Sequence, residues 1–287
     1  MKLSEAWQGL PLIIRALAAG GILVIGTGLL PWRFLLPANL RFASWLPWTV
    51  PIMGGYLWLW WRYLGGWGWP RSTGEARRRD RRGELPPRRL WGWSLAAGGA
   101  GAVALRALTD AARRLSPRPE EDLLPQEILA GHPSVTVVFL ILMTAVVSGV
   151  VEEAGFRGYI QAPLERRHGP WIAILLAGTF VSLAQSPAEA PGIIPWLVLV
   201  PVYYAGTVVF GILAHLSGSI LPGILCHTAF NAAGLFWYRR WGIPGPVWEA
   251  GIDAPFRARC AAVLVFGALA VLFFRKLAAV AAQERRA

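Results

Sequence analysis

The feature that most constrains this chain is a series of apolar runs, each of about 20 residues, separated by loops of which several are rich in arginine. A transmembrane helix needs roughly 20 largely apolar residues, because the hydrocarbon core of a bilayer is about 30 Å thick. Inside that core the backbone must satisfy its own hydrogen bonds, as helices do. The pattern therefore predicts an all-α, polytopic integral membrane protein.

About eight windows have this length and apolar character, and we expect a transmembrane helix in each. They cover residues 12–30, 46–64, 91–108, 135–151, 171–184, 193–214, 220–237 and 260–274. The third window is rich in Gly and Ala, which should let neighbouring helices approach closely. Three regions follow from the windows: N-terminal helices over 1–133, a compact helical core over 134–240, and a C-terminal loop with the last helix over 241–287.

Charge and composition support a membrane location. The chain is 55% hydrophobic, contains 16 Trp and has a formal net charge of +12. Eight Arg fall between Arg71 and Arg89, and we expect this segment to be a solvated, irregular loop on the cytoplasmic side. Both termini are then cytoplasmic, in a bacterial inner (plasma) membrane. Membrane lipids are expected partners, whereas nucleic acid is not, because no nucleic-acid module surrounds the basic clusters.

A pair of carboxylates directly follows the fourth window. Glu152 and Glu153 are succeeded by Arg157, and ionisable residues at such positions are functional candidates because charges near the membrane interior are costly. Glu153 and Arg157 have the spacing of a helical ion pair. Glu152 lies about 100° further around the helix, so it should be free to face the core as a base toward water. The alternative is that the pair only caps the helix.

A second constellation lies in the seventh window. His227 and Asn231 are four residues apart and share one helix face, with Gly223 and Gly234 on nearly the same stripe. The glycines would admit a close helix neighbour, and the imidazole and amide could donate hydrogen bonds to an oxyanion. A packing role for His227 is the alternative. His215, at the end of the sixth window, is expected to be interfacial.

The motifs Glu152-Glu153-Ala-Gly-Phe-Arg157 and His227-Thr-Ala-Phe-Asn231 together resemble those of the CPBP family of intramembrane proteases. This family includes the type II CAAX prenyl endopeptidases and bacteriocin-processing relatives. The resemblance implies that Glu152 activates water, that His227 and Asn231 bind the carbonyl oxygen, and that Glu153 and Arg157 support the site. It leaves the cofactor open, because Glu152 and His227 could hold Zn²⁺ or polarise water directly.

The resemblance covers about residues 134–240 and contains one departure. Members of the family usually carry a His on the helix after the Glu pair, but the aligned stretch here is Val181-Ser-Leu-Ala-Gln185. A Gln amide can position a water molecule, but it cannot take its proton and is a poor zinc ligand. His168, in a predicted loop earlier in the chain, is not expected to substitute.

Two functions follow as hypotheses. The first is an intramembrane endopeptidase that hydrolyses a peptide or membrane-protein substrate with water activated by Glu152. The second is a pseudoprotease, a membrane subunit or chaperone that binds a partner helix in the same cavity, and Gln185 motivates it. A transporter could use the same buried Glu and His, but the chain shows no internal repeat of the kind many transporters have.

Overall fold

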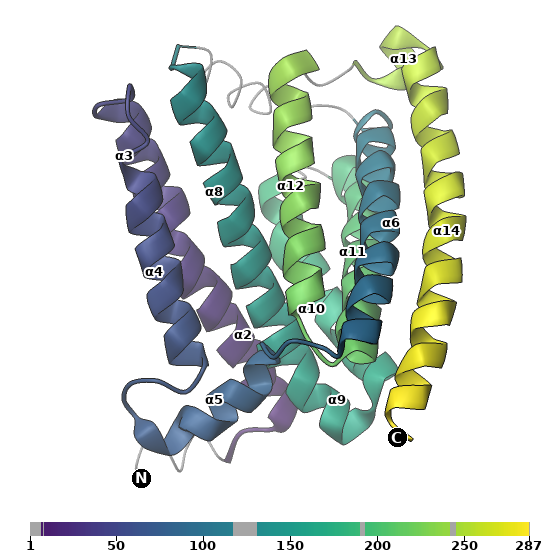
Figure 1. Cartoon of the computed structure of the whole chain (residues 1–287). Coiled ribbons are helices and arrows are strands. Elements are labelled where there is room, and N and C mark those ends of the chain that lie inside the picture. Colours follow the sequence, from purple (N-terminus) through teal and green to yellow (C-terminus); the bar gives the residue numbers. More distant parts are fainter. Residues whose placement is uncertain (1–6, 8, 117–130, 190–192, 242–244, 287) are drawn as a thin grey trace.

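The computed structural model describes residues 7, 9–116, 131–189, 193–241 and 245–286, with the backbone alone for 184–189 and 238–241. Every regular element in these residues is a helix (Figure 1), which confirms the all-α prediction. In chain order the elements are α2 (Leu12–Leu29), η1 (Leu30–Leu35), α3 (Leu36–Arg41), α4 (Thr49–Leu64), η2 (Arg71–Thr73), α5 (Gly74–Arg81), α6 (Arg88–Arg113), α8 (Ser134–Glu152), η4 (Glu153–Gln161), α9 (Ala162–His168), α10 (Pro170–Glu189), α11 (Ile193–Ser217), α12 (Leu221–Trp241), α13 (Val247–Ala250) and α14 (Ala254–Glu284).

A helix covers each predicted window, but fewer helices have the length and composition of a membrane span. Among the described residues, four continuous helical segments do: Leu12–Arg41, Ser134–His168, Ile193–Ser217 and Ala254–Glu284. Helix α4 has only 16 residues, and the part of α10 whose side chains are described, Pro170–Leu183, is an apolar helix shorter than a span. Helices α6 and α12 combine small residues with charged ones, which lowers their hydropathy. The structure thus supports a membrane protein, but eight spans are not confirmed.

Two predicted spans continue through π-helical segments that the sequence did not indicate. The first continues from α2 through η1 and α3, with Pro31 and Pro37 each in the first turn of its segment. The fourth continues past Glu152 through η4 and α9. The glutamate pair therefore lies within a continuous helical segment, and His168 ends a helix instead of lying in a loop.

Most arginines of the arginine-rich segment are exposed, as its charge predicted, but the segment is not an irregular loop. It contains η2 and α5, and the side chain of Arg77 is buried. An arginine can be buried when its donors face hydrogen-bond acceptors, here mainly backbone carbonyls, and its stem lies along apolar surface. We call the end of the bundle where α5, α9 and the C-terminus lie the arginine-rich end (Figure 1).

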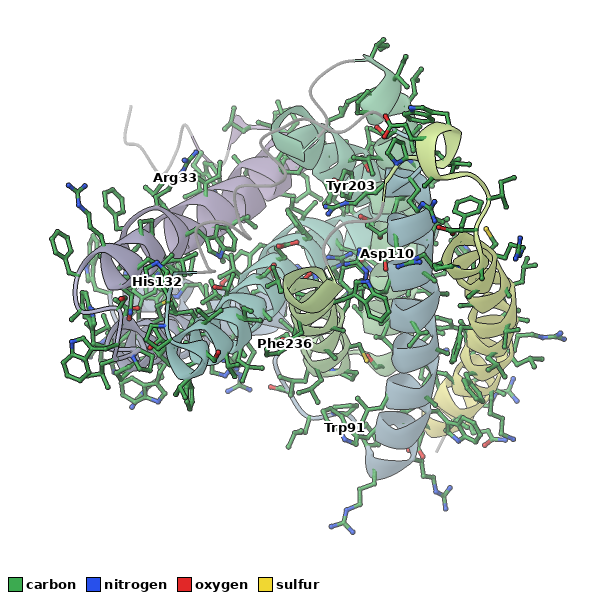
Figure 2. All side chains as sticks on the ribbon, turned by 90° about the horizontal axis from the view of Figure 1, so that it is seen from above. Arg33, Trp91, Asp110, His132, Tyr203 and Phe236 are labelled. Atoms are coloured by element: carbon green, nitrogen blue, oxygen red, sulfur yellow. The ribbon has the colours of Figure 1, made fainter. Side chains whose placement is uncertain are left out.

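Helix α12 stands between α8 and α6, as the side view and the view from above both show (Figures 1 and 2). On one side, α4 and α8 share an apolar cluster that includes Met53 and Leu140. On the other, α6 packs so closely against α12 that a Cβ at Gly98 would lie 2.8 Å from Cys226 Sγ. The close approach predicted from the glycines of α6 is confirmed, and α12 is placed where groups from both sides can meet.

Candidate functional site

The two predicted motifs face each other where α8 passes into η4 beside α12. A Cβ at Gly149 would lie 3.1 Å from the Ile224 carbonyl oxygen and 3.2 Å from the Thr228 nitrogen, so α8 and α12 are almost in backbone contact. A Cβ at Gly223 would lie 2.7 Å from Oε2 of Glu153. The close approach predicted from Gly223 is therefore confirmed, and it is what lets a carboxylate reach α12.

Both glutamates approach His227 from the junction of α8 and η4. His227 Nδ1 lies 2.9 Å from Glu153 Oε1, and its Nε2 lies 3.8 Å from Glu152 Oε2. The π-helical turn begins at Glu153. A π turn holds more residues than an α turn, which changes the directions of successive side chains, and such turns are frequent at functional sites. The imidazole is thus held between two carboxylates.

Glu153 is the buried member of the pair, with no exposed side-chain surface. Its Oε1 lies 3.0 Å from Arg157 Nη1, which confirms the predicted ion pair. Arg157 Nη2 also donates to the Gly206 carbonyl oxygen at 3.4 Å, so it links η4 to α11. Buried charges are tolerated when they are paired in this way. The pair belongs to the interior of the site and is more than an exposed cap.

Aromatic rings fix the plane of His227. Phe210 of α11 stacks on the imidazole with 5.0 Å between centroids and an interplanar angle of 15°. Phe230, one turn along α12 from His227, meets the ring edge-on at 6.2 Å. With its Nδ1 hydrogen-bonded to Glu153, the ring is left with Nε2 directed toward Glu152.

Ser148 is a member of the site that the sequence reasoning missed. It lies one turn before Glu152 on α8, and its hydroxyl donates a hydrogen bond to Glu152 Oε1. The Ser148 hydroxyl oxygen also accepts a hydrogen bond of 3.0 Å from Asn231 Nδ2. The hydroxyl therefore connects the candidate base to the candidate oxyanion donor. The i, i+4 spacing of Ser148 and Glu152 was the available signal for it.

The other predicted residues lie as follows. Gln185 belongs to α10, but its side chain is outside the described part of the structure. His215 lies near the end of α11, with its Nδ1 2.7 Å from Glu165 Oε1, and Arg82 binds the other oxygen at 2.9 Å. This second cluster joins the C-terminal end of α5 to α9 and α11.

Within the described residues, no group of three or more His, Cys, Asp and Glu side chains could hold a metal ion. Glu152 and His227 offer two ligands, whereas a catalytic zinc site usually has three from the protein. The donor set in this part of the chain does not fit zinc, and no step proposed below passes through a metal.

Comparison with known protein families identifies the region that contains this site. Residues 134–233, which hold both motifs, match the family model described as type II CAAX prenyl endopeptidase Rce1-like. No curated protein and no solved structure matches the chain. The predicted family resemblance is confirmed over this region, and residues 134–233 are accordingly assigned to the CAAX protease family, as a type II CAAX prenyl endopeptidase Rce1-like region.

Proposed function

We propose that the chain is an intramembrane endopeptidase that hydrolyses peptide bonds with water activated by Glu152. The observation that carries the proposal is the grouping of Glu152, His227 and Asn231 at the junction of α8, η4 and α12. A family match alone gives the reaction class but no residue roles. The distances between these three side chains support a separate role for each.

The charge balance of the cluster favours a hydrogen-bond donor at Nε2 of His227. With Glu152, Glu153 and Arg157 ionised, the cluster is neutral when the imidazole carries a proton on both nitrogens. Neutral groups of paired charges are less costly in an apolar interior than a net charge. In that form, Nε2–H can donate to a substrate oxygen.

The reaction then proceeds in two proton transfers. Glu152 takes a proton from water as the water oxygen bonds to the carbonyl carbon, and the C=O electron pair moves onto oxygen. Asn231 and His227 stabilise that oxyanion, and each such donor is worth roughly 10²–10³ in rate in other hydrolases. Glu152 next gives the proton to the amide nitrogen as the C–N bond breaks and the C=O bond re-forms, which leaves a carboxylic acid and an amine; the acid then gives its proton to the amine or to water.

Glu153 and Arg157 act as positioning residues in this scheme. They touch His227 and the backbone of α11 but lie on the Nδ1 side of the ring, away from Glu152. A buried ion pair that orients an imidazole is a common means of keeping a catalytic group in one geometry.

A second function is favoured by one residue. Gln185 stands where the family usually has a His, and a Gln cannot accept a proton from water. If Glu152 alone is too weak a base, the chain is a pseudoprotease that binds a partner's transmembrane helix in the same place. A plasma-membrane location with the arginine-rich end in the cytoplasm suits either function.

The test is cleavage of a library of membrane-spanning peptides by the purified protein and by its Gln185→His variant, read by mass spectrometry. Specific products from the wild-type protein support the protease. No product from wild type, products from Gln185→His and a stoichiometric membrane protein that co-purifies with wild type would support the pseudoprotease instead.

A further inference from the structure

A buried arginine braces the turn that joins α4 to α5 at the arginine-rich end. The side chain of Arg77 is buried, and its guanidinium lies 4.0 Å from the centre of the Tyr63 ring. It donates hydrogen bonds of 2.7–3.5 Å to the Thr73 hydroxyl and to the carbonyl oxygens of Tyr63, Trp67, Gly68 and Pro70. One side chain thus satisfies several acceptors of the turn at once, which fixes the turn in one conformation.

The braced turn displays large aromatic side chains instead of burying them. Trp69 is 85% exposed and Trp67 is 55% exposed, and Trp58 on the last turns of α4 is 56% exposed. Tryptophans gathered at one end of a membrane helix are typical of the depth of the lipid headgroups, where an apolar ring and a polar N–H are both accommodated.

An exposed arginine lies among these rings. The Arg62 guanidinium is 5.1 Å from the centre of the Trp58 ring and 5.3 Å from that of Trp67, so it is held between α4 and the turn. Among the described residues, no carboxylate forms an ion pair with Arg62. Stacking orients the planar guanidinium and leaves its N–H groups at the edges of the stack.

Most acidic groups nearby are already engaged by other arginines. Glu84 lies 3.6 Å from Arg78, and Asp80 pairs with Arg166 at 2.6 Å. Glu75 is the remaining acid of α5, and Arg71, exposed at the start of η2 and two residues after Trp69 in the sequence, adds a second cation. The surface formed by the end of α4 and the turn therefore carries exposed tryptophan rings, two available guanidinium groups and little negative charge.

We propose that Trp58, Arg62, Trp67, Trp69 and Arg71, called here the Trp–Arg surface, bind the headgroup of an anionic phospholipid. The guanidinium forks match the geometry of a phosphate, and the rings lie against the upper acyl chains. The bracing by Arg77 means that the surface is already in its binding conformation, so little ordering entropy is lost when lipid binds.

The experiment uses the full-length protein reconstituted in phosphatidylcholine vesicles that contain a minor fraction of phosphatidylglycerol. After gentle extraction, native mass spectrometry counts the phosphatidylglycerol retained per protein. Wild type should retain it preferentially, and a variant with Arg62→Gln and Arg71→Gln should lose about fivefold in apparent affinity for each arginine, on the basis of roughly 1 kcal/mol per basic residue.

The matched control replaces two exposed arginines at the same end of the bundle, Arg285→Gln and Arg286→Gln, which lie after α14. It should retain lipid as wild type does. Equal losses in both double variants would indicate diffuse attraction by net charge. Full retention in the first variant would show that Arg62 and Arg71 do not hold the lipid. Either result would overturn the proposal. Arg62→Lys guards against misfolding: it keeps the charge, so wild-type-like melting with reduced retention is expected, and unchanged retention would also count against the stacked guanidinium.

Discussion

His227 lies between two carboxylates whose surroundings differ. The side chain of Glu153 has no exposed surface and is paired with Arg157, whereas that of Glu152 is 14% exposed and is held by Ser148. A group that must exchange protons with water needs access to it, and a group that orients an imidazole does not. The difference in burial is the physical basis for assigning the base to Glu152 and the positioning role to Glu153.

Loss of the Glu153 charge should destabilise the fold. Glu153→Gln preserves the size of the side chain but leaves Arg157 buried without its counter-ion, and breaking buried pairs costs about 3–5 kcal/mol. A large drop in melting temperature in detergent is expected. Glu84→Gln, which breaks an exposed pair with Arg78, should change it little; equal melting temperatures for the two variants would contradict the buried ion pair.

Ser148→Ala should lower kcat with little change in KM. The hydroxyl orients Glu152 and Asn231 without a place in substrate binding, and a loss of about tenfold is expected from one misaligned hydrogen bond of about 1.4 kcal/mol. The control is Thr144→Ala, one turn earlier on α8, which should keep wild-type kinetics. A rise in KM alone would mean that Ser148 contacts substrate.

Much of the candidate site was predictable from residue spacing, and part was not. The pairing of Glu153 with Arg157 follows from i, i+4 geometry. The contact of Glu153 with His227 did not follow, because it depends on how α8 and η4 lie against α12. Phe210 likewise reaches the imidazole from α11, and no local pattern in the sequence indicates a partner so far along the chain.

At the scale of elements, the glycines of α8 and α12 determine whether the two motifs meet. Gly149→Ala would place a methyl group against the Ile224 carbonyl and the Thr228 side chain, so the helices would have to separate. Such overpacking costs about 1–3 kcal/mol, and the melting temperature should fall together with activity. Gly99→Ala, where a Cβ meets nothing within 4 Å, should be neutral or slightly stabilising; the same fall there would show that the effect is not steric.

The positions of the helices could be predicted from apolar runs, but their irregular parts could not. Hydropathy located the helices because each residue of a membrane helix contributes its own free energy of transfer into lipid, and the sum over a window can be read from the sequence. The π-helical segments η1 and η4 continue spans past their apolar limits, and they depend on contacts with neighbours. Helix α5 was missed because charge density indicates solvation, whereas Arg77 gains backbone acceptors that only the folded turn provides.

For the whole molecule, the last helix is fastened to the bundle at the end opposite the arginine-rich end. Arg114, which follows α6 and is 1% exposed, donates to Asp253 Oδ1 at 2.6 Å and to the Gly245 carbonyl oxygen at 2.9 Å. Asp253 also accepts from the Phe256 nitrogen and so caps α14. One ion pair thus ties the start of α14 to the end of α6 (Figure 1).

This tie should depend on pH. The hydrogen bond from Arg114, with that from the Phe256 amide, holds the pKa of the Asp253 carboxyl below its usual value. The stabilisation is present above the ordinary value of about 4 and is lost as the pH falls through the lowered folded-state pKa. The melting temperature of wild type should therefore fall below pH 4 more steeply than that of Asp253→Asn. Glu249→Gln, an exposed control on α13, should follow wild type, and parallel curves for Asp253→Asn and wild type would contradict the proposed tie.

The measurement that tests the central proposal most directly is the rate at which Glu152→Gln cleaves the membrane peptide that wild type cleaves fastest, with melting temperatures measured on both proteins. Removal of the general base with retention of the fold should lower kcat by about 10²–10⁴. A folded Glu152→Gln protein that cleaves within a few fold of wild type would show that Glu152 does not activate the water, and the proposed mechanism would be wrong.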